Sequence, residues 1–127
     1  MTVKNLNAAP VKCSWYMHPE YTVGGEAVSH SDLLKLPIGG GVVEIPYWTG
    51  LGDRTTPEFT AGYWELVSPS KNYRIRQEFS PDKFRKPRLW FGVGCCNFEM
   101  ESSRELILAP GESWNGTLKW IFARMDN

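Results

Sequence analysis

Apolar and polar residues alternate with a period of two along several short segments of this chain. This spacing is typical of β-strands that bury one face and leave the other in water. The segment Tyr73–Phe79 is the clearest case, because its odd positions hold Tyr, Ile, Gln and Phe and its even positions hold Arg, Arg and Glu. We therefore expect a half-solvated antiparallel strand there. The same kind of pattern predicts further strands at residues 11–17, 41–46, 61–67, 88–96, 106–109 and 117–123.

Two glycine-bearing turn signals lie among the last strands. Pro110-Gly111 suits a type II turn, because proline presets the first central residue and glycine adopts the positive φ of the second. Asn115-Gly116 is a strong hairpin signal, so we expect the flanking strands to turn back on each other there. No segment has a convincing helical period, and Ser31–Leu34 is interpreted as a short turn. The pattern predicts an all-β fold, an antiparallel β-sandwich in which residues 1–127 form a single domain.

The composition supports a packed core and argues against a nucleic-acid partner. Of the 127 residues, 42% are hydrophobic and 13% aromatic, which is unlike a disordered chain. Lys plus Arg and Asp plus Glu number 14 each, so no net charge attracts nucleic acid or anionic membranes. A locally basic stretch at 71–88 is interleaved with aromatic rings, but Glu78 and Asp82 interrupt it. We interpret this stretch as a solvated strand face and a loop.

The cysteines do not predict a disulfide framework or a metal centre. The chain has three cysteines, Cys13, Cys95 and Cys96, and an odd number cannot all be paired within one chain. Cys95 and Cys96 are neighbours, and neighbours on a strand point to opposite faces, so we do not expect a bond between them. There is no Cys-x-x-Cys and the chain has two histidines, so we expect no metal site. Phosphate-loop and dinucleotide fingerprints are also missing, and we expect no cofactor. Neither a signal peptide nor a run of transmembrane length is evident, which predicts a cytoplasmic protein without a membrane partner.

The long connection at residues 47–60 has the composition of a carbohydrate-binding loop. Tyr47 and Trp48 offer flat rings for the C–H faces of a sugar, and Arg54 can bind its hydroxyl groups. Long irregular loops in compact domains are often functional. The alternative is that the tryptophans are core residues, as most are in small β-proteins.

A histidine and two carboxylates are candidates for acid–base chemistry. His18 ends the first strand, where it can project into a cleft and exchange protons near neutral pH. Glu99 and Glu101 are two residues apart and share a face if the strand continues. Their proximity would raise the pKa of one of them, which suits a proton acceptor. The alternatives are an ordinary histidine at a strand end and two acids on a solvated bend.

Three separated segments resemble a known family in order and content. Met17–Tyr21 resembles the His-Pro-aromatic segment of the galactose mutarotase-like proteins, the aldose 1-epimerase superfamily. Leu89-Trp90-Phe91 with Phe98–Ser103, and Leu108–Ser113, are similar to later motifs of that family, although Met100 stands where its motif has proline. The resemblance implies a β-sandwich that binds hexoses in a surface cleft and interconverts sugar anomers. It further implies His18 as the general acid and Glu99 as the general base.

The resemblance places this chain at the C-terminal half of a longer fold. A half-sandwich leaves sheet edges and apolar faces open, which proteins usually pair or cover. We therefore expect a homo-oligomer such as a homodimer, a partner chain, or a smaller sandwich that is complete in itself.

Three classes of function follow from the sequence. The first is a carbohydrate-binding or carbohydrate-active protein whose ligand is a small sugar. Its candidate residues are the catalytic pair His18 and Glu99 and the substrate-binding residues Tyr47, Trp48, Arg54 and Glu101. The second is a non-catalytic β-sandwich interaction or assembly module, such as a phage or virion structural subunit. The third is a small enzyme of another type that uses His18 with Glu99 and Glu101.

Overall fold

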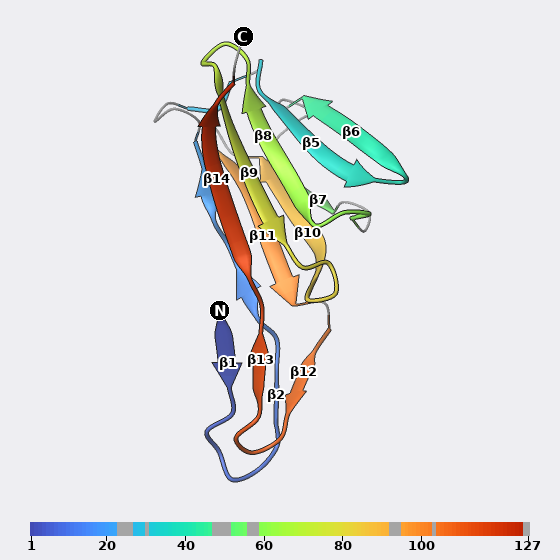
Figure 1. The fold of residues 1–127 in the computed structure, drawn as a ribbon, viewed down its shortest axis with the longest axis vertical. Coiled ribbons are helices and arrows are strands. Elements are labelled where there is room, and N and C mark those ends of the chain that lie inside the picture. The colour runs from blue at the N-terminus through green and yellow to red at the C-terminus, as the bar shows by residue number, and fades with distance from the viewer. Residues whose placement is uncertain are drawn as a thin grey trace.

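A computed structural model describes residues 1–22, 27–29, 31–46, 52–55, 59–91, 95–102 and 104–125, with only the backbone at 52–55, 85–88 and 91. The described residues form strands and no helix, which confirms the all-β prediction (Figure 1). The strands are β1 Thr2–Lys4, β2 Val11–Cys13, β3 Tyr16–Met17, β4 Glu20–Tyr21, β5 Leu33–Ile38, β6 Gly41–Pro46, β7 Gly52–Thr55, β8 Tyr63–Ser68, β9 Tyr73–Phe79, β10 Phe84–Phe91, β11 Cys96–Ser102, β12 Leu106–Leu108, β13 Ser113–Asn115 and β14 Leu118–Arg124.

Two five-stranded sheets lie face to face and make up the wide part of the molecule (Figure 1). The front sheet has the order β14-β9-β8-β5-β6. The back sheet has the order β3-β11-β10-β7, and β4 also pairs with β11. All of these pairings are antiparallel, which confirms the antiparallel β-sandwich. Two short ribbons, β1-β13 and β2-β12, extend below the sandwich as a narrow stalk (Figure 1).

The hydrophobic core fills the space between the two sheets. The front sheet contributes Trp64 and Leu66, and the back sheet contributes Phe98, Met100 and Leu89, all fully buried. The ring centroids of Trp64 and Phe98 lie 4.3 Å apart in a stacked arrangement across the two sheets. Because aromatic side chains bury a large apolar area, contacts of this kind contribute strongly to the stability of the sandwich.

The outer face of the front sheet carries a ladder of opposite charges. Arg76 bonds Glu65 at 3.1 Å and Glu78 at 3.0 Å, and the Nζ of Lys119 lies 3.2 Å from Glu78. In β9 the residues of the other parity face the core, so the alternation predicted for Tyr73–Phe79 is confirmed. The basic residues of this strand therefore lie on a solvated face.

The two C-terminal turn signals have different outcomes. Gly111 has a φ of 77°, and the amide of Glu112 donates to the carbonyl of Ala109 at 3.0 Å, as a turn over Pro110-Gly111 requires. The hairpin prediction at Asn115-Gly116 is wrong, because β13 pairs with β1 and β14 pairs with β9. Gly116 is needed for space instead: a Cβ atom there would lie 2.6 Å from a ring atom of Phe84.

Several predicted elements are divided differently in the structure. The segment 11–17 splits into β2 and β3, because the chain leaves the ribbon and joins the back sheet. The segment 88–96 is likewise divided, because β10 ends at Phe91 and β11 begins at Cys96. The turn interpretation of Ser31–Leu34 was too long, since β5 begins at Leu33 and buries Leu34 and Leu36 in the core. The connection 47–60 contains the short strand β7. Within the described ranges, no helix is long and apolar enough to cross a membrane.

Candidate functional site

The register of the back sheet places His18 opposite Glu99. Met17 pairs with Met100 in β3, and Glu20 pairs with Asn97 in β4. One continuous register satisfies both pairs, and within it position 18 faces position 99. Residues opposite each other on antiparallel strands have side chains on the same face. Pro19 separates β3 from β4 because it has no N–H group to contribute to the ladder.

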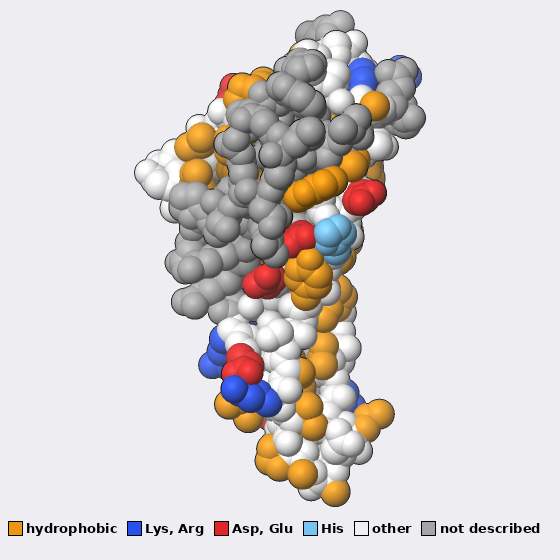
Figure 2. Space-filling model, turned by 180° about the vertical axis from the view of Figure 1, so that it is seen from behind, with side chains coloured by type: hydrophobic (Ala, Val, Ile, Leu, Met, Phe, Trp, Pro, Cys, Tyr) orange, Lys and Arg blue, Asp and Glu red, His pale blue; other side chains and the backbone are white. Residues whose placement is uncertain are grey.

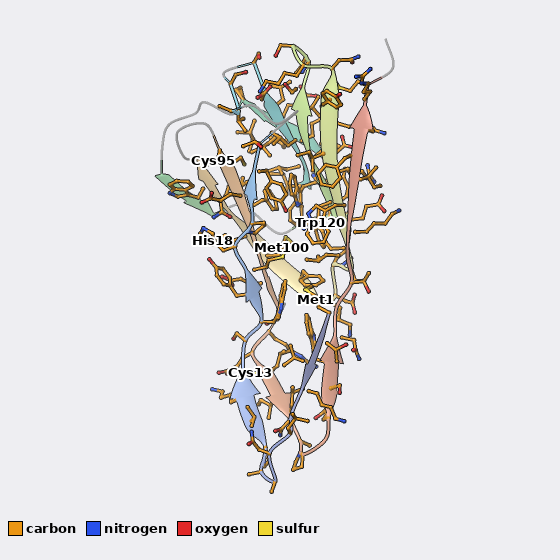
Figure 3. All side chains as sticks on the ribbon, turned by 90° about the vertical axis from the view of Figure 1, so that its left-hand side faces the viewer. Met1, Cys13, His18, Cys95, Met100 and Trp120 are labelled. Carbon is orange, nitrogen blue, oxygen red and sulfur yellow. The ribbon has the colours of Figure 1, made fainter. Side chains whose placement is uncertain are left out.

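These side chains lie on the outer face of the back sheet, away from the core. In β11 the residues Cys96, Phe98 and Met100 belong to the core, so Asn97 and Glu99 point to the opposite side. Figure 3 shows His18 on the outer side of this sheet and Met100 and Trp120 on its inner side. Figure 2 shows the histidine, in pale blue, beside acidic side chains on the back of the molecule.

The histidine and the glutamate form a close pair of unequal exposure. The Nδ1 of His18 lies 2.5 Å from the Oε1 of Glu99, and the hydroxyl of Tyr16 lies 3.0 Å from the same nitrogen. The side chain of His18 is 51% exposed, whereas that of Glu99 is 5% exposed. The carboxylate of Glu99 is therefore buried, and the imidazole that it contacts is at the surface.

Asn97 holds the second ring nitrogen of His18. Its Nδ2 contacts the Nε2 of His18, and an amide N–H in that position donates to a neutral ring nitrogen. The imidazole proton then sits on Nδ1 and is donated to Glu99. The Oδ1 of Asn97 is buried and has no hydrogen-bond partner among the described residues. A half-turn of the amide would bring this oxygen to Nε2, so the site can also hold the protonated imidazolium.

The other predicted site residues have different outcomes. Glu101 lies on the outer face with Glu99, is exposed, and is the register partner of Tyr16. Arg54 lies in β7 with its backbone opposite Leu89, and the structure describes only its backbone. Tyr47 and Trp48 lie outside the described residues.

Sequence reasoning missed the part played by Asn97. It counted Trp90 among the aromatic rings that could contact a sugar, but did not place it beside Asn97. Asn97 is fully buried although it faces away from the core. Trp90 is its register partner on β10 and is half-buried, so its ring lies on the same face of the sheet. The signal for both was the period of two: residues 97, 99 and 101 share one face once the strand is known to begin at Cys96.

The cysteines near this site are poor nucleophiles. Burial raises the pKa of the Cys96 thiol to about 12, and the neighbouring Cys95 adds to this shift. Burial and the charge of Glu20 also raise the pKa of Cys95. Because the thiolate is the reactive form, neither residue suits covalent catalysis near neutral pH. In the described part of the chain, no cluster of three or more His, Cys, Asp or Glu residues could hold a metal ion.

Comparison with known proteins identifies the fold through structure and not through sequence. No family model and no curated protein matches the chain. A galactose mutarotase-like protein from Clostridium acetobutylicum superimposes with a TM-score of 0.73 at 15% identity, covering 98% of this chain and 51% of that one. The fold of this chain is similar to about half of that galactose mutarotase-like protein.

Two further solved structures share this fold. The Slr1438 protein from Synechocystis gives a TM-score of 0.64 at 16% identity, covering 97% of this chain and 49% of that protein. A TPR-domain containing protein from Parabacteroides distasonis gives 0.59 at 12% identity, covering 95% of this chain and 26% of that one. The chain therefore spans about half the length of the first two structures. The family resemblance seen in the sequence motifs is confirmed at the level of the fold.

Proposed function

We propose that this protein binds a small sugar on the outer face of the back sheet and interconverts its anomers by acid–base chemistry. The observation that carries the proposal is the contact of 2.5 Å between His18 Nδ1 and the buried carboxylate of Glu99. The galactose mutarotase-like fold supports a carbohydrate as the ligand. Acid–base catalysis needs two such groups within reach of one substrate.

The reaction requires one proton acceptor and one proton donor on the same side of the sugar. Glu99 takes the proton of the anomeric hydroxyl, and the electron pair of that O–H bond forms the new carbonyl. The bond from the anomeric carbon to the ring oxygen breaks, and the protonated His18 supplies a proton to that oxygen. Rotation of the open chain and the reverse steps then give the other anomer. The two side chains must part to admit the sugar, and the exposed imidazole is the one that can move.

Aromatic residues near the pair provide surfaces for the sugar ring. Trp90 is the register partner of Asn97, and Tyr16 is exposed beside His18. Aromatic rings of this kind present an apolar plane together with a polar edge, which suits a ligand with C–H faces and hydroxyl groups. Tyr47, Trp48, Arg54 and Glu101 remain the predicted substrate-binding residues, and their contacts with a sugar are part of this proposal.

The test is an assay of anomer interconversion with Glu99→Gln. Freshly dissolved anomers of several hexoses would be followed by NMR, with and without protein. We expect wild-type protein to accelerate at least one sugar and Glu99→Gln to lower the rate by about 10²–10⁴-fold. Binding, followed by saturation-transfer NMR, should survive this substitution because the amide keeps the shape of the carboxyl group.

A matched control is Glu105→Gln in the stalk. Glu105 is an exposed carboxylate that pairs at 2.7 Å with Lys12 of the stalk strand β2, and it is not one of the predicted site residues. This variant should keep the full rate. Turnover that survives Glu99→Gln would refute the acid–base assignment, and a wild-type protein that neither binds nor converts any hexose would refute the function.

A further inference from the structure

One side of the sandwich is open, and an edge strand of each sheet borders it. β14 pairs with β9 over its whole length, from Leu118 to Arg124, and no described strand pairs with its other side. β3 and β4 form the matching edge of the back sheet. Figure 3 looks onto this side, with β14 in red facing the blue segments and Trp120 between them. Unpaired N–H and C=O groups on an edge strand invite pairing with another strand.

The open side is apolar where the core reaches it. Phe122 is 70% exposed although its register partner Ile75 is buried in the core. Residues opposite each other share a face, so Phe122 points toward the core side. It is exposed because no described strand lies beyond β14 in this sheet. A groove of about 490 Å³ runs along this side and is lined by Tyr21, Ile75, Trp120 and Phe122 among others.

The edge lacks the features that usually prevent strand pairing. β14 contains no proline, and its register with β9 is unbroken over seven residue pairs. Its two cations are held over its own sheet: Lys119 pairs with Glu78 at 3.2 Å, and the Nε of Arg124 donates to the hydroxyl of Tyr73 at 3.1 Å. Charges, prolines and bulges are the common means of blocking an edge. None of these three features blocks the free edge of β14.

We propose that a second copy of this chain covers the open side by antiparallel pairing of β14 with β14 about a two-fold axis at Ile121. A two-fold contact uses the same surface on both copies. Both cores lie on the same side of the joined sheet only if residues of equal parity oppose each other. Centring on Ile121 meets this condition and uses the whole strand. Trp120 then faces Phe122 of the second copy, and no two like charges are directly opposed.

The length of the fold favours a second copy over a smaller partner. The chain spans 51% of the structure from Clostridium acetobutylicum and 49% of the Slr1438 structure from Synechocystis. A sandwich of their size requires about as much polypeptide again, and one further copy supplies that amount. The proposal depends on β14 and not on the His18–Glu99 pair, so it stands or falls independently of the sugar chemistry.

A designed disulfide tests the symmetry directly. The variant Ile121→Cys, made in a Cys13→Ser/Cys95→Ser background, places a thiol on the proposed axis. Opposed Cα atoms in antiparallel strands are about 4.5–5.5 Å apart, which lies inside the range that a disulfide spans. We expect a covalent dimer under mild oxidation. Ala123→Cys in the same background is the control, because its thiol would face Lys119 of the other copy.

The mass of the protein in solution provides a second test. Light scattering after size-exclusion chromatography should give a dimer for the wild type and a monomer for Phe122→Lys. Ile107→Lys changes an equally exposed residue in the stalk and should leave the dimer intact. Circular dichroism checks that each variant is folded. A monomeric wild type at the highest soluble concentration, or equal cross-linking of Ile121→Cys and Ala123→Cys, would overturn the proposal.

Discussion

The indole Nε1 of Trp120 donates a hydrogen bond of 3.0 Å to the hydroxyl oxygen of Tyr21. Trp120 lies in β14 and Tyr21 in β4, so this bond ties the edge of the front sheet to the edge of the back sheet. The Nε2 of Gln77 lies 3.5 Å from the same oxygen, and Gln77 also accepts from Trp64. One phenol oxygen therefore links the open side of the sandwich to the buried polar group at its centre.

The first prediction concerns removal of this oxygen. Tyr21→Phe leaves the N–H groups of Trp120 and Gln77 without their acceptor, and Gln77 is fully buried. An unsatisfied buried donor costs about 1–3 kcal/mol, so we expect the free energy of unfolding to fall by about that amount. Urea denaturation followed by tryptophan fluorescence measures it. Tyr16→Phe, at an exposed position, should change stability by less than about 0.5 kcal/mol.

The second prediction concerns alkaline pH. Burial raises the pKa of Tyr21 to about 12, with Cys96 adding to the shift and the Trp120 hydrogen bond opposing it. A tyrosine in an unfolded chain has a pKa near 10, so the folded state holds this proton more tightly. The resulting stabilisation is complete below about pH 10 and is lost as the pH rises toward 12. The full stabilisation is about 2–3 kcal/mol, because the pKa of Tyr21 rises from near 10 in the unfolded chain to about 12 in the folded one.

The difference between wild type and Tyr21→Phe isolates this titration from that of the lysines. Urea denaturation at pH 8, 10 and 11 should give a wild-type stability that falls more steeply than that of the variant. Parallel curves for the two proteins would mean that Tyr21 does not titrate differently in the folded and unfolded states.

The third prediction concerns Asn97 as the residue that orients His18. Without its amide, the imidazole keeps its contact with Glu99 but loses the partner of Nε2. We expect Asn97→Ala to lower sugar turnover by up to about 100-fold, because small misplacements of a reacting group have effects of that size. The nitrogen-15 resonance of His18 Nε2 should also shift, because this nitrogen loses its hydrogen-bond donor, while the proton on Nδ1 stays with Glu99. A purely structural role would lower stability and leave the Nε2 resonance unchanged.

A matched control for this experiment is Asn115→Ala. Asn115 lies in the stalk, where it accepts a hydrogen bond of 2.8 Å from Thr2 at an exposed position. The substitution Asn115→Ala should leave both the sugar turnover and the nitrogen-15 spectrum of His18 as they are in the wild type.

The sequence predicted those features that depend on a local pattern. The period of two in Tyr73–Phe79 corresponds to a strand with one buried face, and Pro110-Gly111 carries the positive φ that its turn needs. The Asn115-Gly116 hairpin failed because the partner of β13 is β1, at the other end of the chain. A two-residue turn signal carries no information about a competing strand that is distant in sequence.

In the candidate site, too, the sequence predicted some residues, and others depend on long-range pairing. The motif resemblance brought His18 and Glu99 together as a pair, and the structure places their atoms in contact. Asn97 was missed because its importance comes from burial and from the register of β4 with β11, which the residues alone do not reveal. The roles assigned to Tyr47, Trp48, Arg54 and Glu101 remain predictions.

The fourth prediction concerns the reactivity of the thiols. Cys96 is fully buried and its pKa is raised to about 12, so at pH 8 about one molecule in ten thousand carries the thiolate. We expect iodoacetamide to modify Cys96 only after unfolding in urea. Cys95 should react more slowly in the folded than in the unfolded chain, because burial raises its pKa too. Peptide mass spectrometry reads each site, and rapid labelling of Cys96 without urea would show that β11 leaves the core.

The fifth prediction separates two reasons for a glycine. At Gly116 a Cβ atom would lie 2.6 Å from a ring atom of Phe84 and 2.7 Å from one of Trp114, at the junction of the stalk and the sandwich. Phe84 is buried, so its ring cannot yield without disturbing the core. We expect Gly116→Ala to lower the free energy of unfolding by about 1–3 kcal/mol, the usual effect of overpacking.

Gly41 supplies the matched control for that substitution. It begins β6, has nothing within 4 Å of an added Cβ atom, and does not adopt a positive φ. Gly41→Ala should be neutral or stabilise by up to about 1 kcal/mol, because alanine restricts the unfolded chain. Urea denaturation compares the two variants under identical conditions. If Gly116→Ala proves as harmless as Gly41→Ala, then the rings of Phe84 and Trp114 move apart freely, and the stalk is joined to the sandwich less tightly than their packing indicates.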